Sequence, residues 1–520
     1  MSTDEASGAL LRRLHDHNPW WEDGVDSLSL PARQKSDFYH LARPDEAISQ
    51  FEDHPISALV GRRGVGKSTL LEQFVQHRIE AGADPEQFLY VPFDADPLYQ
   101  LQSAEQLRQA VRYYESRILG RADDPTPQFV VLDDVHQVEH ASKPNSTGWG
   151  RPVSELLDAP DRHVIVTASA GIQVERELDR VGIDASEYDV QPILPEKFRD
   201  YIYTLYPDLE ADDKRVSPTP LRTGEQSLPT AVETGDIDLF VEGLREQYDR
   251  IADDTRRIQS QVVDYLAMGG VLSYSQEGVV DSASELSRRD YERLRKDVRD
   301  ALYQDVPGFE TIQTIADLER LCALAARDCA SDPIRYQRLV DLFDVDRRTI
   351  TDSYLPALSE LYLLDGVTEY DNSRPRSVRL YLRDTGLVTA LADGDASRVL
   401  SDFDREADLA RAAAFDHTMR FQYGVEAIQG RTVEPSVQYW RGREDTVDFI
   451  FEVDGTPVPV GFGYRPPVDS VEAALTEFLD TYDAPVGLLL VGDTVSTDEP
   501  IAVQDDRLIR LPYWFFLLLC

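Results

Sequence analysis

Short apolar runs alternate with helix-like segments along the first part of the chain. The runs, each of four to six residues, are predicted strands at residues 56–60, 88–93, 129–132 and 163–167. Residues 68–81 and 104–119 place apolar side chains at the spacing of an amphipathic helix. Continuous apolar runs are typical of strands buried on both faces. The alternation therefore predicts a doubly wound parallel α/β sheet with helices on both faces.

The middle of the chain has a mainly helical pattern. Residues 194–274 are predicted to be mostly helical, with a polar break at 217–229 and an end at Gly269-Gly270. A second helical region follows over about residues 275–364. It contains a helix at 335–343, a turn at 344–346 and a longer helix from Arg347, and two β-like runs come next, around 366–369 and 378–382. Helix, turn, helix and hairpin in this order predict a winged helix.

The last part of the chain changes pattern again near Ser401. One helix is predicted at 407–421, followed by strands at 436–441, 446–452, 458–464 and 486–491. The final residues, 511–520, are strongly apolar but about half as long as a membrane-spanning helix needs to be. We therefore expect them to form a buried terminal strand or an interface.

A glycine-rich run joins the first predicted strand to the first predicted helix. Two glycines separated by four residues, then lysine and serine, give the spacing of a P-loop. Backbone N–H groups of such a loop converge on the β-phosphate, while Lys67 is placed to neutralise the β- and γ-phosphates and Ser68 to bind Mg²⁺. A guanine site would need an Asn-Lys-x-Asp sequence, which the chain lacks, so ATP is favoured. The residues predicted to bind it are Gly61, Arg62, Arg63, Gly64, Val65, Gly66, Lys67, Ser68 and Thr69.

A pair of acidic residues follows the third predicted strand. Asp133 stands at the carboxyl end of that strand, the edge at which open α/β sheets bind ligands, and is expected to help to bind Mg²⁺. Asp134 is placed to orient or deprotonate the attacking water. Aspartate is one methylene shorter than the glutamate usual at that place. Hydrolysis is therefore expected to be slow or to use a bridging water.

The fourth predicted strand ends in polar residues that could contact the γ-phosphate as a sensor. Thr167 and Ser169 are both eligible, and a plain strand-end turn is the alternative. An arginine finger is also left open, because Arg176, Arg180 and Arg199 are all available and nothing in the sequence selects among them.

The composition adds a strong acidic bias. The net charge is −42, and the lysines are Lys35, Lys67, Lys143, Lys197, Lys214 and Lys296. Diffuse acidity with arginine in place of lysine favours a salt-accumulating source, the alternative being a merely acidic protein. Three cysteines cannot form a disulfide framework, and Cys322 and Cys329 are predicted to be small core residues.

The N-terminal arm, which extends to about Arg43, has no apolar core of a secretory signal in its polar first residues, 1–8. A cytoplasmic location without membrane association is predicted. The arm carries paired tryptophans in Asn18-Pro-Trp-Trp-Glu22. We expect them to dock on the next domain, because two exposed indole rings would be costly.

Together these motifs make the chain resemble a family of archaeal and bacterial AAA-type ATPases that carry a C-terminal domain of formerly unknown function. The resemblance covers most of the chain and marks it as a haloarchaeal-looking member. It implies an ATPase core, a helical lid, a winged helix and a terminal domain similar to the restriction endonucleases. Its markers are the P-loop, Leu132-Asp-Asp-Val-His136, Val166-Thr-Ala-Ser-Ala170, Gly269-Gly270 and, most specifically, Arg379-Leu-Tyr-Leu-Arg-Asp-Thr-Gly-Leu387.

The terminal domain departs from the pattern of an active nuclease of that kind, which holds Mg²⁺ with an Asp and a Glu beside a Lys. Asp448 matches the first acid and Asp416 an upstream one, but Gly461 and Gly463 stand where the glutamate and lysine are expected. No lysine follows Lys296. The domain is therefore predicted not to cleave. The predicted segments are an arm (1–43), a P-loop ATPase core (44–193), a helical lid (194–274), a helical region with winged helix (275–395) and a degenerate restriction-endonuclease-like α/β domain (396–520).

The leading hypothesis is an Mg²⁺-dependent ATPase that acts as a nucleotide-dependent molecular switch, reorienting the lid and winged helix. The alternatives are an ATP-regulated DNA-binding or DNA-processing protein and a nucleotide-binding scaffold without turnover. DNA is not favoured as a partner, because arginines only balance the local charge and high salt weakens phosphate contacts. No protein partner is identified. The arginines concerned are Arg335, Arg338, Arg347, Arg348, Arg374, Arg376 and Arg379.

Overall fold

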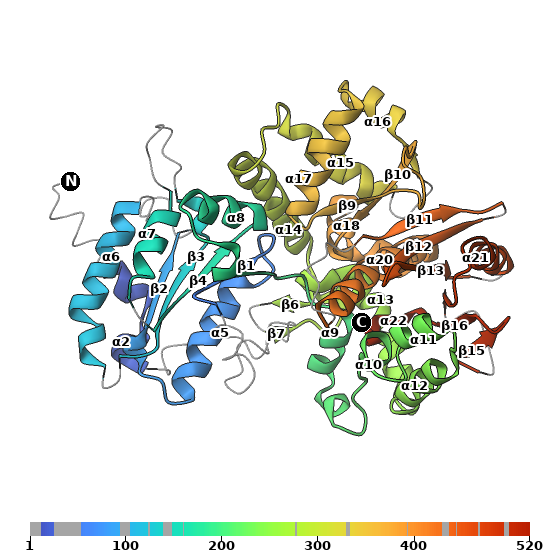
Figure 1. Ribbon diagram of the computed structural model, residues 1–520, viewed down its shortest axis with the longest axis horizontal. Helices are drawn as coiled ribbons and strands as arrows, with labels where there is room; N and C mark the ends of the chain where they lie inside the picture. Colours follow the sequence, from blue (N-terminus) through green and yellow to red (C-terminus); the bar gives the residue numbers. More distant parts are fainter. Residues whose placement is uncertain are drawn as a thin grey trace. The chain divides into compact units, whose positions relative to one another are not determined.

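The chain forms two compact units (Figure 1). The first combines Met1–Leu194 with Asp297–Gln313 and Glu360–Tyr362, and the second contains Pro195–Lys296, Thr314–Ser359 and Leu363–Cys520. The predicted segments do not anticipate that Asp297–Gln313 belongs to the first unit. The computed structural model describes residues 12–24, 54–93, 104–122, 125–138, 148–159, 161–275, 278–328, 333–392, 394–428, 436–443, 445–465, 468–492 and 499–520.

The first unit is built on a five-stranded sheet in which every neighbouring pair is parallel. The prediction of a parallel α/β sheet is confirmed, and each of the four predicted strands is present. In spatial order the strands are β2 (Phe88–Pro92), β3 (Gln128–Asp133), β4 (Arg162–Ala168), β1 (Ile56–Val60) and β5 (Tyr188–Pro192).

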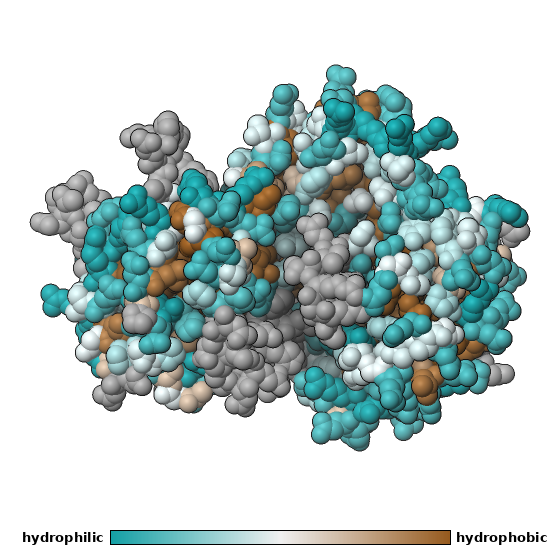
Figure 2. All heavy atoms as spheres, in the orientation of Figure 1, coloured by the Kyte–Doolittle hydropathy of each residue, from teal (hydrophilic) through white to brown (hydrophobic). Residues whose placement is uncertain are grey.

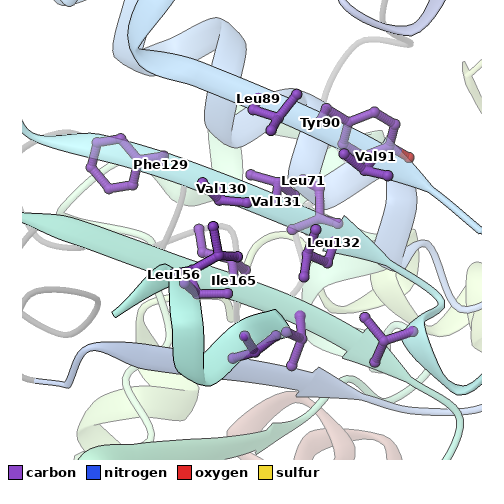
Figure 3. Packing of buried hydrophobic residues seen from close by; sticks show 14 of the residues in the cluster. Leu71, Leu89, Tyr90, Val91, Phe129, Val130, Val131, Leu132, Leu156 and Ile165 are labelled. Carbon is purple, nitrogen blue, oxygen red and sulfur yellow. The ribbon is translucent and has the colours of Figure 1, made fainter. Parts of the chain in front are cut away.

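Helices cover both faces of this sheet. The connection from β1 through α5 (Lys67–Glu80) to β2 and the connection from β4 through α8 (Gly171–Arg180) to β5 cross the sheet in opposite directions. Because such crossovers are right-handed, the two helices lie on opposite faces. The core between helices and strands includes Leu71 of α5 and Leu156 of α7 (Gly150–Leu156), packed with strand residues such as Val131 (Figure 3).

The fifth strand, β5, is not among the predicted strands. Its sequence, Tyr-Asp-Val-Gln-Pro, has no continuous apolar run, and all five residues are half-buried. Among the described strands, β5 stands at the edge of the sheet and pairs only with β1. An edge position tolerates polar side chains because water reaches it, so the pattern of a fully buried strand is not required there.

The predicted docking of the paired tryptophans is confirmed. Both Trp20 and Trp21 are buried in α2 (Trp20–Asp23), and the Trp21 Nε1 donates a hydrogen bond to the carbonyl oxygen of Phe88 at 2.8 Å. Asn18 pairs with both backbone groups of Tyr90: its Nδ2 donates to the carbonyl oxygen at 2.8 Å, and its Oδ1 accepts from the N–H at 2.7 Å. The arm thus covers the outer edge of β2, which would otherwise present unpaired backbone groups. Residues 1–11 and 25–43 of the predicted arm lie outside the described residues.

The second unit begins with helices. They are α9 (Phe198–Leu205), α10 (Thr219–Arg222), α11 (Leu228–Thr234), α12 (Asp238–Asp249) and α13 (Thr255–Leu272). The predicted polar break at 217–229 is therefore wrong in part, because α10 and the start of α11 lie inside it. Both helices are short, and each has a proline in its first turn, where a missing N–H costs nothing.

The double glycine kinks α13 instead of ending it, which corrects the prediction. Gly269 has φ 66° and ψ −179°, outside the helical region. Asp384 accepts a hydrogen bond from the N–H of Gly270, just after the kink, at 3.0 Å. A Cβ on Gly386 would lie 2.0 Å from a carbonyl oxygen of α13. Two markers of the family resemblance, the double glycine and residues 379–387, therefore meet in one close contact.

The order of elements predicted for the winged helix is present in the second unit. A turn at 344–346, with Asp344 in the left-handed region, separates α16 from a helical stretch that ends in α17. The name winged helix stays a prediction. In chain order the elements are α15 (Ile315–Arg327), β8 (Ile334–Arg335), α16 (Tyr336–Phe343), α17 (Leu355–Glu360), β9 (Leu364–Val367) and β10 (Ser377–Leu382), with the sheet order β8-β10-β9. Before α15, helix α14 (Arg288–Asp300) continues into a π-helical turn at Ala301–Asp305.

The C-terminal part of the second unit holds a mixed sheet of six strands. The sheet order is β11-β12-β13-β14-β16-β15, with parallel pairing only from β13 to β16. The helices α20 (Phe403–Ile428) and α21 (Asp469–Tyr482) accompany it. The strands are β11 (Gln438–Arg441), β12 (Thr446–Val453), β13 (Thr456–Gly463), β14 (Gly487–Val491), β15 (Ala502–Gln504) and β16 (Leu508–Pro512).

The apolar end of the chain, expected to form a buried strand or an interface, is buried, but as a helix and not as a strand. Strand β16 ends at Pro512, and α22 (Tyr513–Leu519) follows with every residue buried. It makes contacts with α9, α20 and β16. A helix that is apolar on all sides is typical of one surrounded by other elements, and its short length hides the helical period.

The surface is mainly hydrophilic on the face shown in Figure 2. The exposed large apolar side chains of the described residues are scattered: Leu239, Tyr303, Leu342, Phe403 and Val503. Cys322 is buried, as predicted, and burial raises the pKa of its thiol to about 12; Cys329 lies outside the described residues. No helix in the described part of the chain is long and apolar enough to cross a membrane.

We predict that Asn18→Ala lowers the free energy of unfolding of the first unit by about 1–3 kcal/mol, because it leaves the two backbone groups of Tyr90 without partners. Denaturant unfolding followed by tryptophan fluorescence measures the change. The matched control is Asp16→Ala, an exposed position in the same arm, with an expected change of at most about 0.5 kcal/mol. An equal effect of the two variants would contradict the edge-covering role of Asn18.

Candidate nucleotide-binding site

The glycine-rich loop connects the end of β1 to the start of α5. Gly64 and Gly66 have φ angles of 81° and 96°, in the left-handed region that favours glycine. Lys67 is the first residue of α5, and its Nζ donates hydrogen bonds to the carbonyl oxygens of Gly61 at 2.8 Å and Arg62 at 3.3 Å. The ammonium group is therefore folded back over the loop, only 6% exposed.

Asp133 ends β3 and is held by hydroxyl groups. The Thr167 Oγ1 donates to its Oδ1 at 2.5 Å, and the Tyr90 hydroxyl donates to its Oδ2 at 2.7 Å. Ser68, the second residue of α5, also hydrogen-bonds this carboxylate. Burial raises the pKa of Asp133, the neighbouring charge of Asp134 raises it further, and the three hydroxyls oppose the shift.

Asp134 leaves the sheet in the left-handed conformation, with φ 55°. Its N–H donates to the Thr167 Oγ1 at 2.7 Å, and its Oδ1 lies 3.9 Å from the Nζ of Lys67. This Oδ1 is buried and has no hydrogen-bond donor among the described residues. The turn thus aims one carboxylate oxygen at the loop lysine, with one acceptor position unused.

The structure separates the two sensor candidates at the end of β4. Thr167 accepts from Asp134 and donates to Asp133, so it fixes both acids. Ser169 instead donates to the Oδ2 of Asp305 at 2.7 Å and lies 3.1 Å from the Nε2 of His136. Thr167 therefore orients the two acids, and Ser169 belongs to a second cluster.

That second cluster is centred on Asp305, a residue that no sequence motif indicates. Arg63 of the loop donates to its carboxylate through Nε at 3.2 Å and Nη2 at 3.0 Å. Gln137 donates at 3.3 Å, and the His136 Nε2 lies 3.4 Å away. Burial alone would raise the pKa of Asp305, but hydrogen bonds and charge from His136 and Arg63 hold it well below its ordinary value.

No motif in the sequence could have identified Asp305, because it lies 242 residues beyond Arg63 in a segment without a recognisable pattern. His136 belongs to a marker of the family resemblance, but that marker assigns it no role. Tyr90, the third missed residue, lies within a predicted strand. Its contact with Asp133 follows from the pairing of β2 beside β3, which the sequence alone does not fix.

The residues present fit a nucleotide with Mg²⁺. At its two left-handed glycines the loop backbone carries no side chain, which lets a phosphate approach the N–H groups closely. Ser68 and Asp133 are already in contact and offer oxygen ligands of the kind that Mg²⁺ prefers. Asp134 follows Asp133 in the chain, and its unused Oδ1 is buried. A water molecule or a cation would satisfy it.

The three candidate finger arginines are all engaged. In the first unit, Arg176 donates to the carbonyl oxygen of Phe309, and Arg180 pairs with Glu177 at 2.5 Å. In the second unit, Arg199 pairs with Asp200 at 3.7 Å. These contacts do not select a finger.

The acids of the predicted nuclease site are paired with arginines in the second unit. Asp448 accepts from the Arg379 Nη1 at 2.9 Å, and Arg411 lies 3.3 Å away. Asp416 is bound by Arg383 at 2.8 Å and by Arg420 at 2.5 Å. Arg379, one of the arginines that balance the local charge of the predicted winged helix, is buried and paired with Asp448. The described residues contain no group of three or more His, Cys, Asp or Glu side chains that could hold a metal ion.

The two glycines of β13 face apolar neighbours. A Cβ on Gly461 would lie 2.7 Å from side-chain atoms of Leu475 and Val471 of α21. A Cβ on Gly463 would lie 2.8 Å from Val468. The places where a nuclease would carry its glutamate and lysine are therefore filled by packing, which leaves no room for longer side chains.

Fold and loop geometry define the first unit as a P-loop nucleotide-binding domain. The sequence of residues 53–199 matches the family described as an AAA domain. The chain therefore contains an AAA domain of the P-loop ATPase class. Residues 279–398 match a domain of unknown function, DUF8612. Among curated proteins, none matches the chain.

Several solved structures are similar to this chain. The Walker-type ATPase of Pyrococcus abyssi is 14% identical, with a TM-score of 0.35 over 71% of this chain and 99% of that one. The ORC2 protein of Aeropyrum pernix is 16% identical, with a TM-score of 0.32 over 75% and 96%. DnaA of Aquifex aeolicus is 12% identical, with a TM-score of 0.23 over 65% and 90%.

We predict that Thr167→Val lowers the free energy of unfolding of the first unit by about 1–3 kcal/mol, because the buried Asp133 carboxylate and the Asp134 N–H each lose a partner. Thr167→Ser keeps the hydroxyl and serves as the matched control, with a smaller loss from the deleted methyl group. Thermal and denaturant unfolding measure both. A valine variant as stable as the serine variant would show that the hydroxyl does not hold the two acids.

Proposed function

We propose that the protein binds ATP in the glycine-rich loop with Mg²⁺ and hydrolyses it slowly. The observation that carries the proposal is that the Thr167 hydroxyl holds both Asp133 and Asp134, while the Nζ of Lys67 lies 3.9 Å from the Oδ1 of Asp134. Ser68 and Asp133 would hold Mg²⁺. When bound, the ion would neutralise charge on the phosphate oxygens.

Lys67 and Asp134 have separate roles in this proposal. Lys67 would leave the carbonyl oxygens of the loop and bind phosphate oxygens. An ammonium group binds a charged phosphate oxygen more strongly than a neutral carbonyl oxygen. Asp134 would accept a hydrogen bond from the attacking water through its unused Oδ1. An aspartate reaches less far than a glutamate, which is the reason for the expected slow turnover.

We further propose that the ATPase works as a molecular switch. The segment Asp297–Gln313 belongs to the first unit, but the chain on each side of it, up to Lys296 and from Thr314, belongs to the second. A nucleotide-dependent change in this segment would therefore act on chain that belongs to both units. Slow turnover is compatible with this role, because a switch needs long-lived states.

Lys67→Ala and Asp134→Asn test the proposed activity. We expect Lys67→Ala to weaken ATP binding at least about tenfold, because the ammonium group is lost. Asp134→Asn should retain binding but reduce Mg²⁺-dependent phosphate release by about 10²-fold or more, since the amide is a poor base. Binding is measured by calorimetry and turnover by phosphate release in molar salt. Wild-type protein without turnover would leave the scaffold alternative, and unchanged turnover in Asp134→Asn would remove Asp134 as the base.

We infer that the C-terminal domain does not cleave DNA. The support is the pairing of Asp448 with Arg379 and Arg411, together with the apolar packing around Gly461 and Gly463. A carboxylate bound by two guanidinium groups is neutralised already and makes a weak metal ligand. Its role in this arrangement is structural.

Asp448→Ala distinguishes a structural from a catalytic role. We expect the variant to lose about 3–5 kcal/mol of stability, because a buried arginine is left without its partner. Denaturant unfolding of the second unit measures the loss. Plasmid nicking with Mg²⁺ or Mn²⁺ should be absent from wild type and variant alike. Robust nicking by the wild type that Asp448→Ala abolishes would overturn the inference.

A further inference from the structure

The donors around Asp305 come from the elements that surround the phosphates in the proposed site. Arg63 is part of the glycine-rich loop, Gln137 and His136 follow β3, and Ser169 follows β4. Their contacts with the two carboxylate oxygens range from 2.7 to 3.4 Å. A single side chain thus takes up donors from all three parts of the site.

The carboxylate behaves as an anion in this position. Asp305 is 1% exposed, and a carboxylate so deeply buried stays charged only where cationic groups and donors compensate for the lost water. Arg63 and His136 provide that compensation and lower the pKa of Asp305 despite its burial. Guanidinium groups bind carboxylates and phosphates with the same fork of N–H donors. The contacts of Asp305 are therefore of the kind that a phosphate oxygen would make.

A second acid of the same segment lies at the loop. A side chain beginning at Gly64 would lie 3.1 Å from the Oδ2 of Asp297. Two carboxylates of Asp297–Gln313 thus border the loop that the nucleotide phosphates would enter. Like charges at such short range repel, so the segment in this position opposes the binding of a polyanion.

The segment has its own anchors next to the site. The Gln173 Nε2 of α8 donates to the main-chain carbonyl oxygen of Asp305 at 3.3 Å, and Arg176 donates to that of Phe309. These main-chain contacts position Asp305 without using the carboxylate. Release of the carboxylate from Arg63 and Ser169 therefore does not by itself free the whole segment.

We propose that Asp297–Gln313 is an internal latch whose Asp305 carboxylate occupies anion-binding donors of the nucleotide site, so that ATP must displace it to bind fully. This proposal rests on the proposed function. A ligand that binds the released state better shifts the protein towards that state. Because only molecules with the latch released bind ATP fully, the apparent association constant is the intrinsic constant multiplied by the fraction of released molecules. Displacement of the latch is also the step that would transmit the effect of ATP binding along the chain to the second unit.

The test compares ATP affinity in wild type, Asp305→Asn and Glu310→Gln. Asparagine keeps the size of the side chain but removes the charge that binds Arg63, so we expect the dissociation constant for MgATP to fall about tenfold. Glu310→Gln removes the same charge from the same segment, away from the donors, and should leave the affinity unchanged. Calorimetry in molar salt measures all three.

Hydrogen exchange gives a readout that is independent of turnover. Amides adjacent to Asp305 should exchange faster in wild type after ATP is added, and faster in Asp305→Asn without nucleotide. If Asp305→Asn does not fold, Asp297→Asn replaces it, with the same direction and a smaller effect. Equal or weaker ATP affinity in the Asn variants would overturn the latch and make Asp305 a structural residue.

The outcomes separate failure of the latch from failure of the ATPase. Wild type that binds ATP in a Lys67-dependent manner, with an unchanged constant in Asp305→Asn, sinks the latch alone. If neither wild type nor Asp305→Asn binds ATP, both the latch and the proposed function fail. Tighter binding in Asp305→Asn that Lys67→Ala abolishes supports both.

Discussion

The register of three parallel strands is the constraint on which the candidate site depends. β3 pairs with β4 so that Leu132 is opposite Val166, and β1 pairs with β4 so that Leu59 is opposite Thr167. This alignment brings the ends of the three strands together and places Thr167 within reach of Asp133 and of the Asp134 N–H. A slip of one residue would turn Thr167 to the opposite face of the sheet and break both hydrogen bonds. The pairing of these strands, more than any single side chain, brings together the glycine-rich loop, the acids Asp133 and Asp134, and the end of β4.

The parts of this arrangement that local sequence determines could be predicted. Glycine spacing specifies the loop, and buried parallel strands need apolar runs, so the loop and Asp133 followed from the sequence. The parts that depend on distant neighbours could not. β5 is polar because it lies at an edge, and α22 is apolar all round because other elements enclose it. Asp305 contacts the loop because Asp297–Gln313 folds with the first unit, although the chain before it, Pro195–Lys296, belongs to the second. No local sequence pattern indicates this contact.

Residues that mark the resemblance to a family can have a packing role and take no part in catalysis. The double glycine and residues 379–387 serve one packing contact, in which Asp384 binds the backbone at the kink of α13 and Gly386 allows close approach. Arg379, from the same marker, neutralises Asp448 in the C-terminal sheet. The most specific marker of the resemblance thus joins the helical part of the second unit to its mixed sheet. It constrains the fold of that unit, and the nucleotide chemistry has to be argued from the first unit alone.

The acidic composition decides which contacts at the loop can persist in concentrated salt. Screening lengths fall to about 3 Å at 1 M, so exposed charges lose most of their mutual attraction or repulsion while buried pairs lose little. The repulsion between a nucleotide and the net charge of −42 is therefore weakened. The attraction between Arg63 and Asp305, which are 3.0 Å apart with an unexposed carboxylate, is not weakened in this way. In molar salt, a nucleotide would therefore compete with Asp305 by direct hydrogen bonds and not by long-range attraction. Phosphate oxygens, which accept short charge-assisted hydrogen bonds, are suited to that competition.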